Sequence, residues 1–213
     1  MHEKKLIIVG AGGCGREVLQ WALAAMPYQS EWHIAGFLDD NPEALKGYET
    51  GYALLGAVSS WQPQSDEVFV CAIGSPGVKK RVALSLEERG ARFATIIHPT
   101  AILATTAFLG KGVVLSPFST VSADAVIGDH AFLNLNTSIG HDAKVGSYST
   151  LSSYVDVTGY VKIGDSVFVG SHVAIVPKVS VGDGAFLCAG SIIMTHVKQG
   201  QKMLGNPARK FAL

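Results

Sequence analysis

Aliphatic residues recur at every sixth position through the second half of the chain. From Ile97 to Ile193 this column contains only Ile, Leu or Val, and it ends before Gln199. A second column, two residues ahead of each aliphatic, contains only small or β-branched residues from Ala101 to Ser191. An alternating antiparallel sandwich would show a period of two with irregular turns. The period of six therefore indicates a repeat architecture.

Six residues suit one short strand followed by one corner. Three such faces close a triangular coil of eighteen residues, and stacked coils pair their backbones in parallel ladders. The aliphatic residue would fill the interior, and the small residue would let the chain turn beside it. Glycine often follows the aliphatic residue, as at Gly140, where a corner leaves little room for a side chain. The sequence predicts a left-handed parallel β-helix of hexapeptide repeats over residues 96–213, with a C-terminal tail.

The first half of the chain alternates strand and helix patterns instead. Apolar runs predict buried strands at residues 5–9, 34–38 and 68–73, and helical periodicity predicts helices at 17–26 and 78–89. Strand–helix–strand alternation is typical of a small parallel α/β sheet. We therefore expect a Rossmann-like half domain over residues 1–95, joined to the coils with almost no linker.

Composition and charge exclude several classes of protein. Lys+Arg and Asp+Glu both count 17, so no basic field exists to bind nucleic acid or a membrane surface. No apolar run is long enough for a membrane-spanning helix, and the first residues lack the apolar region of a signal peptide. The three cysteines, Cys14, Cys71 and Cys188, lie far apart without a CxxC pair. We expect reduced thiols in a cytoplasmic protein.

A glycine-rich loop follows the first predicted strand. Residues 10–15 satisfy G-x-G-x-x-G and open a helix, the context in which backbone N–H groups hold phosphate. Asp39 and Asp40 close the second strand, where such folds place a ribose contact. NAD binding is one interpretation, but the domain has half the size of a full dinucleotide fold. A nucleotide sugar or mononucleotide fits better, and a tight glycine turn without ligand is the remaining alternative.

Several motifs together resemble one known family. They are the GAGG loop, the strand ending in LDD, the AIG turn after the third strand, the hexapeptide coils and the GNPARKF tail. The chain resembles, over essentially its whole length, the bacterial nucleotide-sugar acetyltransferases that N-acetylate UDP-linked 4-amino sugars, together with their sialic-acid O-acetyltransferase-like relatives. The resemblance implies an acetyl-CoA-dependent homotrimer without a metal, acting on a nucleotide-linked amino sugar.

The resemblance also implies which residues hold the two substrates. The nucleotide sugar would be bound by Gly12, Gly13, Cys14, Asp39, Asp40 and Gly74. Acetyl-CoA would lie in a groove between neighbouring coils of the trimer, near Thr150, Gly159, Ala189, Gly190, Arg209 and Lys210. Family members commonly carry histidine in place of Cys14, and a second histidine that contacts the acetyl group in place of Thr150.

His141 is the catalytic candidate among the seven histidines. Its segment resembles the family segment in which an asparagine, here Asn134, precedes the catalytic histidine by seven residues and a carboxylate, here Asp142, follows it. A group that titrates near neutrality suits the removal of a proton from a sugar amine attacking a thioester. Asp142 would orient His141 only if the corner turns the two side chains together. The Gly159 N–H, one coil later, is the family's candidate for polarising the thioester carbonyl.

Other functions remain open at this stage. A zinc enzyme on a β-helix needs three converging histidines, two of them close in sequence, and the histidine spacing does not supply that pair. A non-catalytic nucleotide-sugar-binding protein would have the same loop and coils. A sugar O-acetyltransferase would use the same histidine, so the sequence alone does not choose between an amine and a hydroxyl acceptor.

Overall fold

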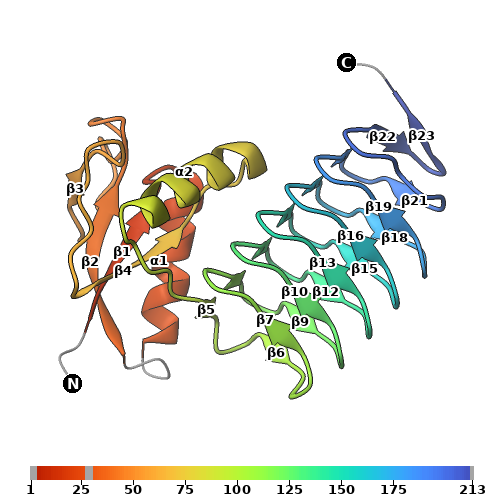
Figure 1. The fold of residues 1–213 in the computed structure, drawn as a ribbon, viewed down its shortest axis with the longest axis horizontal. Coiled ribbons are helices and arrows are strands. Elements are labelled where there is room, and N and C mark those ends of the chain that lie inside the picture. Colours follow the sequence, from red (N-terminus) through yellow and green to blue (C-terminus); the bar gives the residue numbers. More distant parts are fainter. Residues whose placement is uncertain (1–3, 27–30, 212–213) are drawn as a thin grey trace.

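The computed structural model describes residues 4–26 and 31–211 and consists of an α/β part followed by stacked triangular coils (Figure 1). Its α/β part contains β1 (Lys4–Val9), α1 (Gly13–Ala25), β2 (Trp32–Leu38), β3 (Leu54–Gly56), β4 (Glu67–Cys71) and α2 (Pro76–Glu88). The four strands form one parallel sheet in the order β3-β2-β1-β4. The expected Rossmann-like half domain is therefore confirmed.

Two elements of this part differ from the sequence prediction. Helix α1 begins at Gly13, four residues earlier than predicted, because the glycines of the loop already belong to its first turn. A Cβ on Gly15 would lie 1.9 Å from the Gly10 carbonyl oxygen, so only glycine allows the helix to pack so closely on the strand end. Strand β3 was not predicted, because it has only three residues and forms through pairing with β2 at two positions.

Seventeen two-residue strands build the coils, and each one ends on an aliphatic residue of the six-residue column. They are β5 (Ile96–Ile97), β6 (Ile102–Leu103), β7 (Phe108–Leu109), β8 (Val114–Leu115), β9 (Thr120–Val121), β10 (Val126–Ile127), β11 (Phe132–Leu133), β12 (Ser138–Ile139), β13 (Lys144–Val145), β14 (Thr150–Leu151), β15 (Asp156–Val157), β16 (Lys162–Ile163), β17 (Phe168–Val169), β18 (Ala174–Ile175), β19 (Ser180–Val181), β20 (Phe186–Leu187) and β21 (Ile192–Ile193).

These strands stack into three parallel sheets, the faces of a triangular prism. An eight-stranded face runs β23-β22-β20-β17-β14-β11-β8-β5, a six-stranded face runs β21-β18-β15-β12-β9-β6, and a five-stranded face runs β19-β16-β13-β10-β7. Ile139 pairs with Val121 below and Val157 above, and all three are fully buried. The interior is thus a stack of aliphatic side chains, and the expected left-handed parallel β-helix is confirmed.

Each corner depends on two backbone features, a residue in the left-handed conformation and a position where the next coil approaches closely. The third residue after the aliphatic adopts a left-handed conformation even where it is not glycine, as at His130 (φ 56°) and Asp142 (φ 58°). The glycine directly after the aliphatic has another role, because a Cβ on Gly146 would lie 2.3 Å from the carbonyl carbon of Gly164. Glycine at this position therefore permits close approach of the next coil, and the turn itself is made two residues later.

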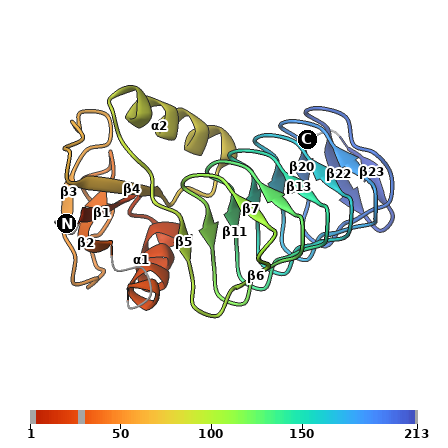
Figure 2. The same cartoon turned by 60° about the horizontal axis from the view of Figure 1, so that its bottom comes forward.

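The α/β part packs on the eight-stranded face, where α1 and α2 lie beside the first coils in both views (Figures 1 and 2). The ring of Trp21 on α1 lies 5.8 Å from that of Phe132 on β11. At the other end, the tail forms a hairpin of β22 (Lys202–Gly205) and β23 (Ala208–Lys210), and β22 pairs in parallel with β20. What the sequence indicated only as a tail thus extends the same face.

Candidate functional site

His141 and Asp142 form a side-chain pair at the corner between the six-stranded and five-stranded faces. The His141 Nδ1 lies 2.9 Å from the Asp142 Oδ2, and 60% of the histidine side chain is exposed. A carboxylate at this distance favours the tautomer with the proton on Nδ1. The Nε2 lone pair then remains free to accept a proton, as a general base requires.

Gly159 lies one coil beyond His141 at the same corner. A Cβ on Gly159 would lie only 2.7 Å from His141 Nε2, so the imidazole ring lies directly against the glycine backbone. The ring also meets Tyr160 edge to face at 5.1 Å. Within the described residues, no protein group accepts a hydrogen bond from the Gly159 N–H. A free base and a free N–H donor thus lie next to each other on what we call the His141 edge, residues 140–143 and 158–161.

Asn134, Ala189 and Gly190 lie on another corner of the prism. They follow β11 and β20, at the corner between the eight-stranded and six-stranded faces, which we call the Asn134 edge (residues 134–137 and 188–191). The Asn134 Oδ1 accepts a hydrogen bond from the Leu135 N–H at 2.7 Å. Ala189 and Gly190 are exposed. One chain therefore does not bring Asn134 to His141, and the residues predicted to bind CoA are divided between two edges.

The glycine loop presents open backbone at the start of α1. Gly12 and Gly13 are exposed, a Cβ on either would meet nothing within 4 Å, and no side chain caps the helix. The Asp39 Oδ2 accepts a hydrogen bond from the Ala11 N–H at 2.8 Å, so this carboxylate braces the loop. The exposed Asp40 accepts from the Ser59 N–H at 2.9 Å.

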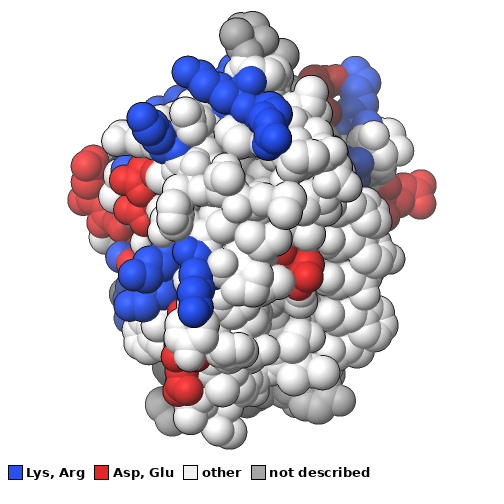
Figure 3. Space-filling view, turned by 90° about the vertical axis from the view of Figure 1, so that its right-hand side faces the viewer, with Lys and Arg blue, Asp and Glu red and all other residues white. Residues whose placement is uncertain are grey.

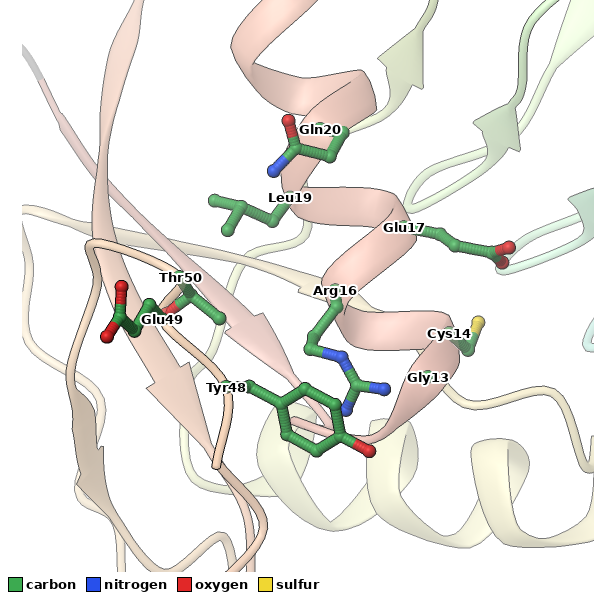
Figure 4. A pocket seen from close by; sticks show the side chains of 9 residues that line it. All are labelled: Gly13, Cys14, Arg16, Glu17, Leu19, Gln20, Tyr48, Glu49 and Thr50. Atoms are coloured by element: carbon green, nitrogen blue, oxygen red, sulfur yellow. The ribbon is translucent and has the colours of Figure 1, made fainter. Parts of the chain in front are cut away.

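A cavity of about 640 Å³ opens beside this loop. Gly13 and Cys14 line it, and the Arg16 guanidinium lies 3.5 Å above the Tyr48 ring (Figure 4). Arg16 extends toward Tyr48, whereas Glu17 points to the other side of α1 (Figure 4). The sequence reasoning missed Arg16 and Tyr48; the position of Arg16 directly after the loop was the only available signal.

Cys14 lies in the first turn of α1, which follows β1, and Gly74 follows the neighbouring strand β4, as expected for a site at the carboxyl edge of a parallel sheet. Cys14 is half-buried, and burial raises the pKa of its thiol to about 12. The thiol is therefore neutral at physiological pH. The cysteines Cys14, Cys71 and Cys188 are all free.

Thr150 lies on the eight-stranded face beneath α2 and is buried. Its Oγ1 accepts a hydrogen bond from the Lys79 Nζ at 2.8 Å. The sequence reasoning did not single out Lys79, which lies at the contact between the two parts of the chain.

Arg209 and Lys210 are exposed on β23. Seen from the C-terminal end of the coils, Lys and Arg side chains form two groups, one toward the top and one on the left, and much of the remaining face is uncharged (Figure 3). This distribution leaves a local basic area on a chain whose formal net charge is zero.

The other histidines in the coils have different surroundings. His130 is buried at the third corner, where its Nε2 lies 3.0 Å from the Glu87 Oε1 on α2 and its ring stacks on Tyr148. His172 is exposed on the Asn134 side and stacks on Tyr154. Neither lies on the His141 edge.

Residues 4–26 and 31–211 contain no group of three His, Cys, Asp or Glu side chains arranged to hold a metal ion. In the same part of the chain, none of the helices has the length and apolar character needed to cross a membrane.

Together, the parallel sheet with a glycine loop and the left-handed coils define a two-part hexapeptide-repeat protein. Residues 5–86 match the PglD N-terminal domain family. UDP-N-acetylbacillosamine N-acetyltransferase from Bacillus subtilis is 32% identical over 114 residues, which are 53% of this chain and 51% of that protein. The match thus spans about half the length of that relative.

Solved structures match over almost the whole chain. The acetyltransferase domain of PglB from Neisseria gonorrhoeae, in complex with acetyl coenzyme A, gives a TM-score of 0.88 at 25% identity, covering 99% of this chain and 100% of that domain. PerB from Caulobacter crescentus, in complex with CoA and GDP-perosamine, gives a TM-score of 0.86 at 23% identity. This match covers 98% of this chain and 97% of PerB. The resemblance to nucleotide-sugar acetyltransferases expected from the sequence is confirmed.

Proposed function

We propose that the protein is an acetyl-CoA-dependent N-acetyltransferase that acts on a nucleotide-linked 4-amino sugar, with His141 as general base. The observation that carries this proposal is the His141 edge, where Nδ1 faces Asp142 and Nε2 lies against Gly159. A base and a hydrogen-bond donor this close together suit acyl transfer from a thioester.

The step is a nucleophilic substitution at the thioester carbonyl. The neutral sugar amine attacks the carbonyl carbon, and the developing oxyanion accepts a hydrogen bond from the Gly159 N–H. His141 Nε2 takes the proton from the amine nitrogen as the new C–N bond forms. When the C–S bond breaks, the proton passes to the sulfur, so the products are the N-acetyl sugar and free CoA thiol. Asp142 stabilises the protonated imidazole in between.

The α/β part would hold the nucleotide sugar at the carboxyl edge of its sheet. The uncapped N-terminus of α1 at Gly12 and Gly13, with Arg16 in the next turn, suits a diphosphate. Gly74, Cys14 and the Asp39–Asp40 turn surround the same edge. The PglB domain was solved with acetyl-CoA, and PerB was solved with CoA and GDP-perosamine. These complexes support the assignment of acetyl-CoA and a nucleotide sugar as the two substrates. A coenzyme of this kind is available in the cytoplasm, where we place the protein.

A homotrimer would complete the site. Three of the residues predicted to bind CoA lie on two different edges of one prism, Gly159 on the His141 edge and Ala189 and Gly190 on the Asn134 edge. If prisms pack side by side about a threefold axis, the His141 edge of one protomer faces a neighbour's Asn134 edge. The shared groove would then contain both sets, with Arg209 and Lys210 near the CoA phosphates.

The test is a transfer screen. The protein is incubated with acetyl-CoA and with UDP-, dTDP- or GDP-linked 4-amino sugars, and released CoA thiol is measured together with the mass of the sugar product. We expect thiol release and a gain of one acetyl group with at least one amino sugar. Turnover only with the matching 4-hydroxy sugars would show that the protein acetylates a hydroxyl group and not an amine. No turnover with any acceptor would contradict an enzymatic role.

A further inference from the structure

Lys79 is a fully buried lysine without a carboxylate partner in the described part of the chain. Its ammonium donates to the Ser149 carbonyl oxygen at 3.1 Å and to the Thr150 Oγ1 at 2.8 Å. The Phe132 ring centroid lies 5.8 Å away. Burying an ammonium is costly, and two neutral acceptors offset that cost only in part. A residue with this cost suggests a role besides packing.

The position of Lys79 connects the nucleotide loop to the coils. Its backbone N–H donates to the Ser75 carbonyl oxygen at 2.8 Å, in the first turn of α2 and directly after Gly74. Its side chain reaches residues some 70 positions later on the eight-stranded face. One residue thus joins the Gly74 turn to a fixed point on the rigid prism.

The charge of Lys79 is sensitive to pH in an accessible range. Burial lowers the pKa of its ammonium to about 8. The titratable groups that face it are the thiols of Cys71 on β4 and Cys14 on α1. Burial raises the pKa of both thiols to about 12, so neither balances the ammonium near neutrality. The positive charge that strengthens this pair of hydrogen bonds is therefore lost as the pH rises through 8.

We propose that Lys79 is a positioning residue for the nucleotide-sugar site: its ammonium ties the Gly74 turn to the Ser149–Thr150 segment of the coils and holds that turn in its binding position. The ammonium can only donate, so it also leaves the Thr150 hydroxyl hydrogen free to donate elsewhere. The inference rests on the proposed function, because the Gly74 turn is assigned to the nucleotide there.

The experiment compares Lys79→Met, which keeps the side-chain volume but removes the charge, with Lys80→Met. Lys80 is the exposed neighbour on α2 and serves as a matched control. Binding of UDP, GDP, dTDP and acetyl-CoA is measured by calorimetry at pH 7.5 and 9. We expect Lys79→Met to weaken binding of the preferred nucleotide about tenfold and to leave acetyl-CoA binding unchanged. One pH unit above its pKa, roughly a tenth of the lysine remains charged. The nucleotide affinity of the wild-type protein should therefore fall by a similar factor between pH 7.5 and pH 9.

Further variants test the role of Lys79 separately from the proposed acetyltransferase function. Lys79→Arg keeps its charge at both pH values, so its nucleotide affinity should not fall between pH 7.5 and 9. If Lys79→Met fails to fold, the pH dependence of nucleotide binding in the wild type against that in Lys79→Arg decides. Equal nucleotide affinity in Lys79→Met and wild type, or a wild-type affinity independent of pH, would overturn the inference. Lys79-dependent nucleotide binding without any acetyl transfer would support it while refuting the enzymatic proposal.

Discussion

The His141 Nδ1 lies 2.9 Å from the Asp142 Oδ2, although the two residues are neighbours in the sequence. Adjacent side chains on an extended strand point to opposite faces and do not meet. Here Asp142 occupies the left-handed corner conformation, with φ at 58°, and this turn brings both side chains to the same side. The pairing is thus a property of the corner.

Replacing His141 with Ala or Asn removes the proposed base but leaves the interior of the coils intact, because the side chain is exposed. General base catalysis contributes roughly 10²–10⁴-fold, so kcat should fall by about that factor. Initial rates of thiol release on the true acceptor measure it, with CoA affinity as a check on the fold.

His172→Ala serves as the comparison, because His172 is an exposed histidine on the Asn134 edge of the proposed groove and is not assigned to proton transfer, so its loss should lower kcat far less than the loss of His141. Asp142→Asn should lower kcat less than His141→Ala does, because the imidazole remains. Near-normal turnover of His141→Ala would mean that another group accepts the proton.

Gly159→Ala should reduce kcat even though the change is one methyl group. Its Cβ would lie 2.7 Å from His141 Nε2, so the imidazole ring must move. A displacement of about 1 Å at a reacting group can cost about 10²-fold. The same change in a His141→Ala background should cost little more, because no ring remains to be displaced. Additive losses in the double variant would show that Gly159 acts independently of His141.

Gly13→Leu should weaken nucleotide-sugar binding and leave acetyl-CoA binding largely intact. Space around Gly13 is open in the free protein, so the fold should tolerate the side chain, which would occupy the place of the diphosphate. Gly13→Ala should fall between the wild type and Gly13→Leu. Calorimetry with each substrate separates the two effects, and tight NAD binding, or loss of acetyl-CoA binding alone, would reverse the assignment.

The oligomeric state tests the shared groove. Sedimentation at micromolar concentration should give about three times the chain mass of 22.4 kDa. An isolated prism would leave its edges exposed, including the large apolar side chains of Phe118, Tyr154 and Tyr160. A stable monomer with full activity would contradict both the trimer and the composite site.

His130 should make the free energy of unfolding depend on pH below neutrality. Burial lowers the pKa of its imidazole, and its Nδ1 has no hydrogen-bond partner. Below about pH 6.5 the unfolded chain therefore binds a proton that the folded chain does not, so stability falls as the pH decreases. The slope from one such proton is at most about 1.4 kcal/mol per pH unit.

His130→Gln keeps a donor for Glu87 but does not titrate. Its free energy of unfolding in urea should therefore change less between pH 7.5 and 5.5 than that of the wild type. Equal pH dependence in both proteins would show that His130 titrates normally in the folded state.

The coils were predictable because every strand ends on a residue that the interior selects. Ile139 and its equivalents fill the same small space in each turn, so the physical requirement repeats in the sequence. Strand β3 and the tail hairpin lack such a pattern, since their pairing with β2 and β20 depends on tertiary contact.

The site was predictable only in part. His141, Asp142 and Gly159 were selected because their segments resemble those of the family, and they lie together in the structure because they are adjacent in the sequence or one coil apart. Lys79 and Thr150 meet across 71 positions, and nothing near either residue in the sequence signals the other. The division of Asn134 and His141 between two edges follows from the six-residue repeat itself, because Asn134 follows Leu133 and His141 follows Ile139, at successive corners of one coil.

The eighteen-residue step between paired neighbours such as Ile139 and Val157 restricts how this chain can change length in evolution. Loss of one residue inside the coils would carry every later aliphatic side chain out of the interior and put the residue that follows it, such as Gly140 or Ser152, in its place. Loss or gain of a whole turn would leave all other pairings unchanged. Descendants of this sequence should therefore differ in length by complete turns or by loops inserted at corners, and only turns beyond His141 can be gained or lost without changing the distance from the nucleotide loop to His141.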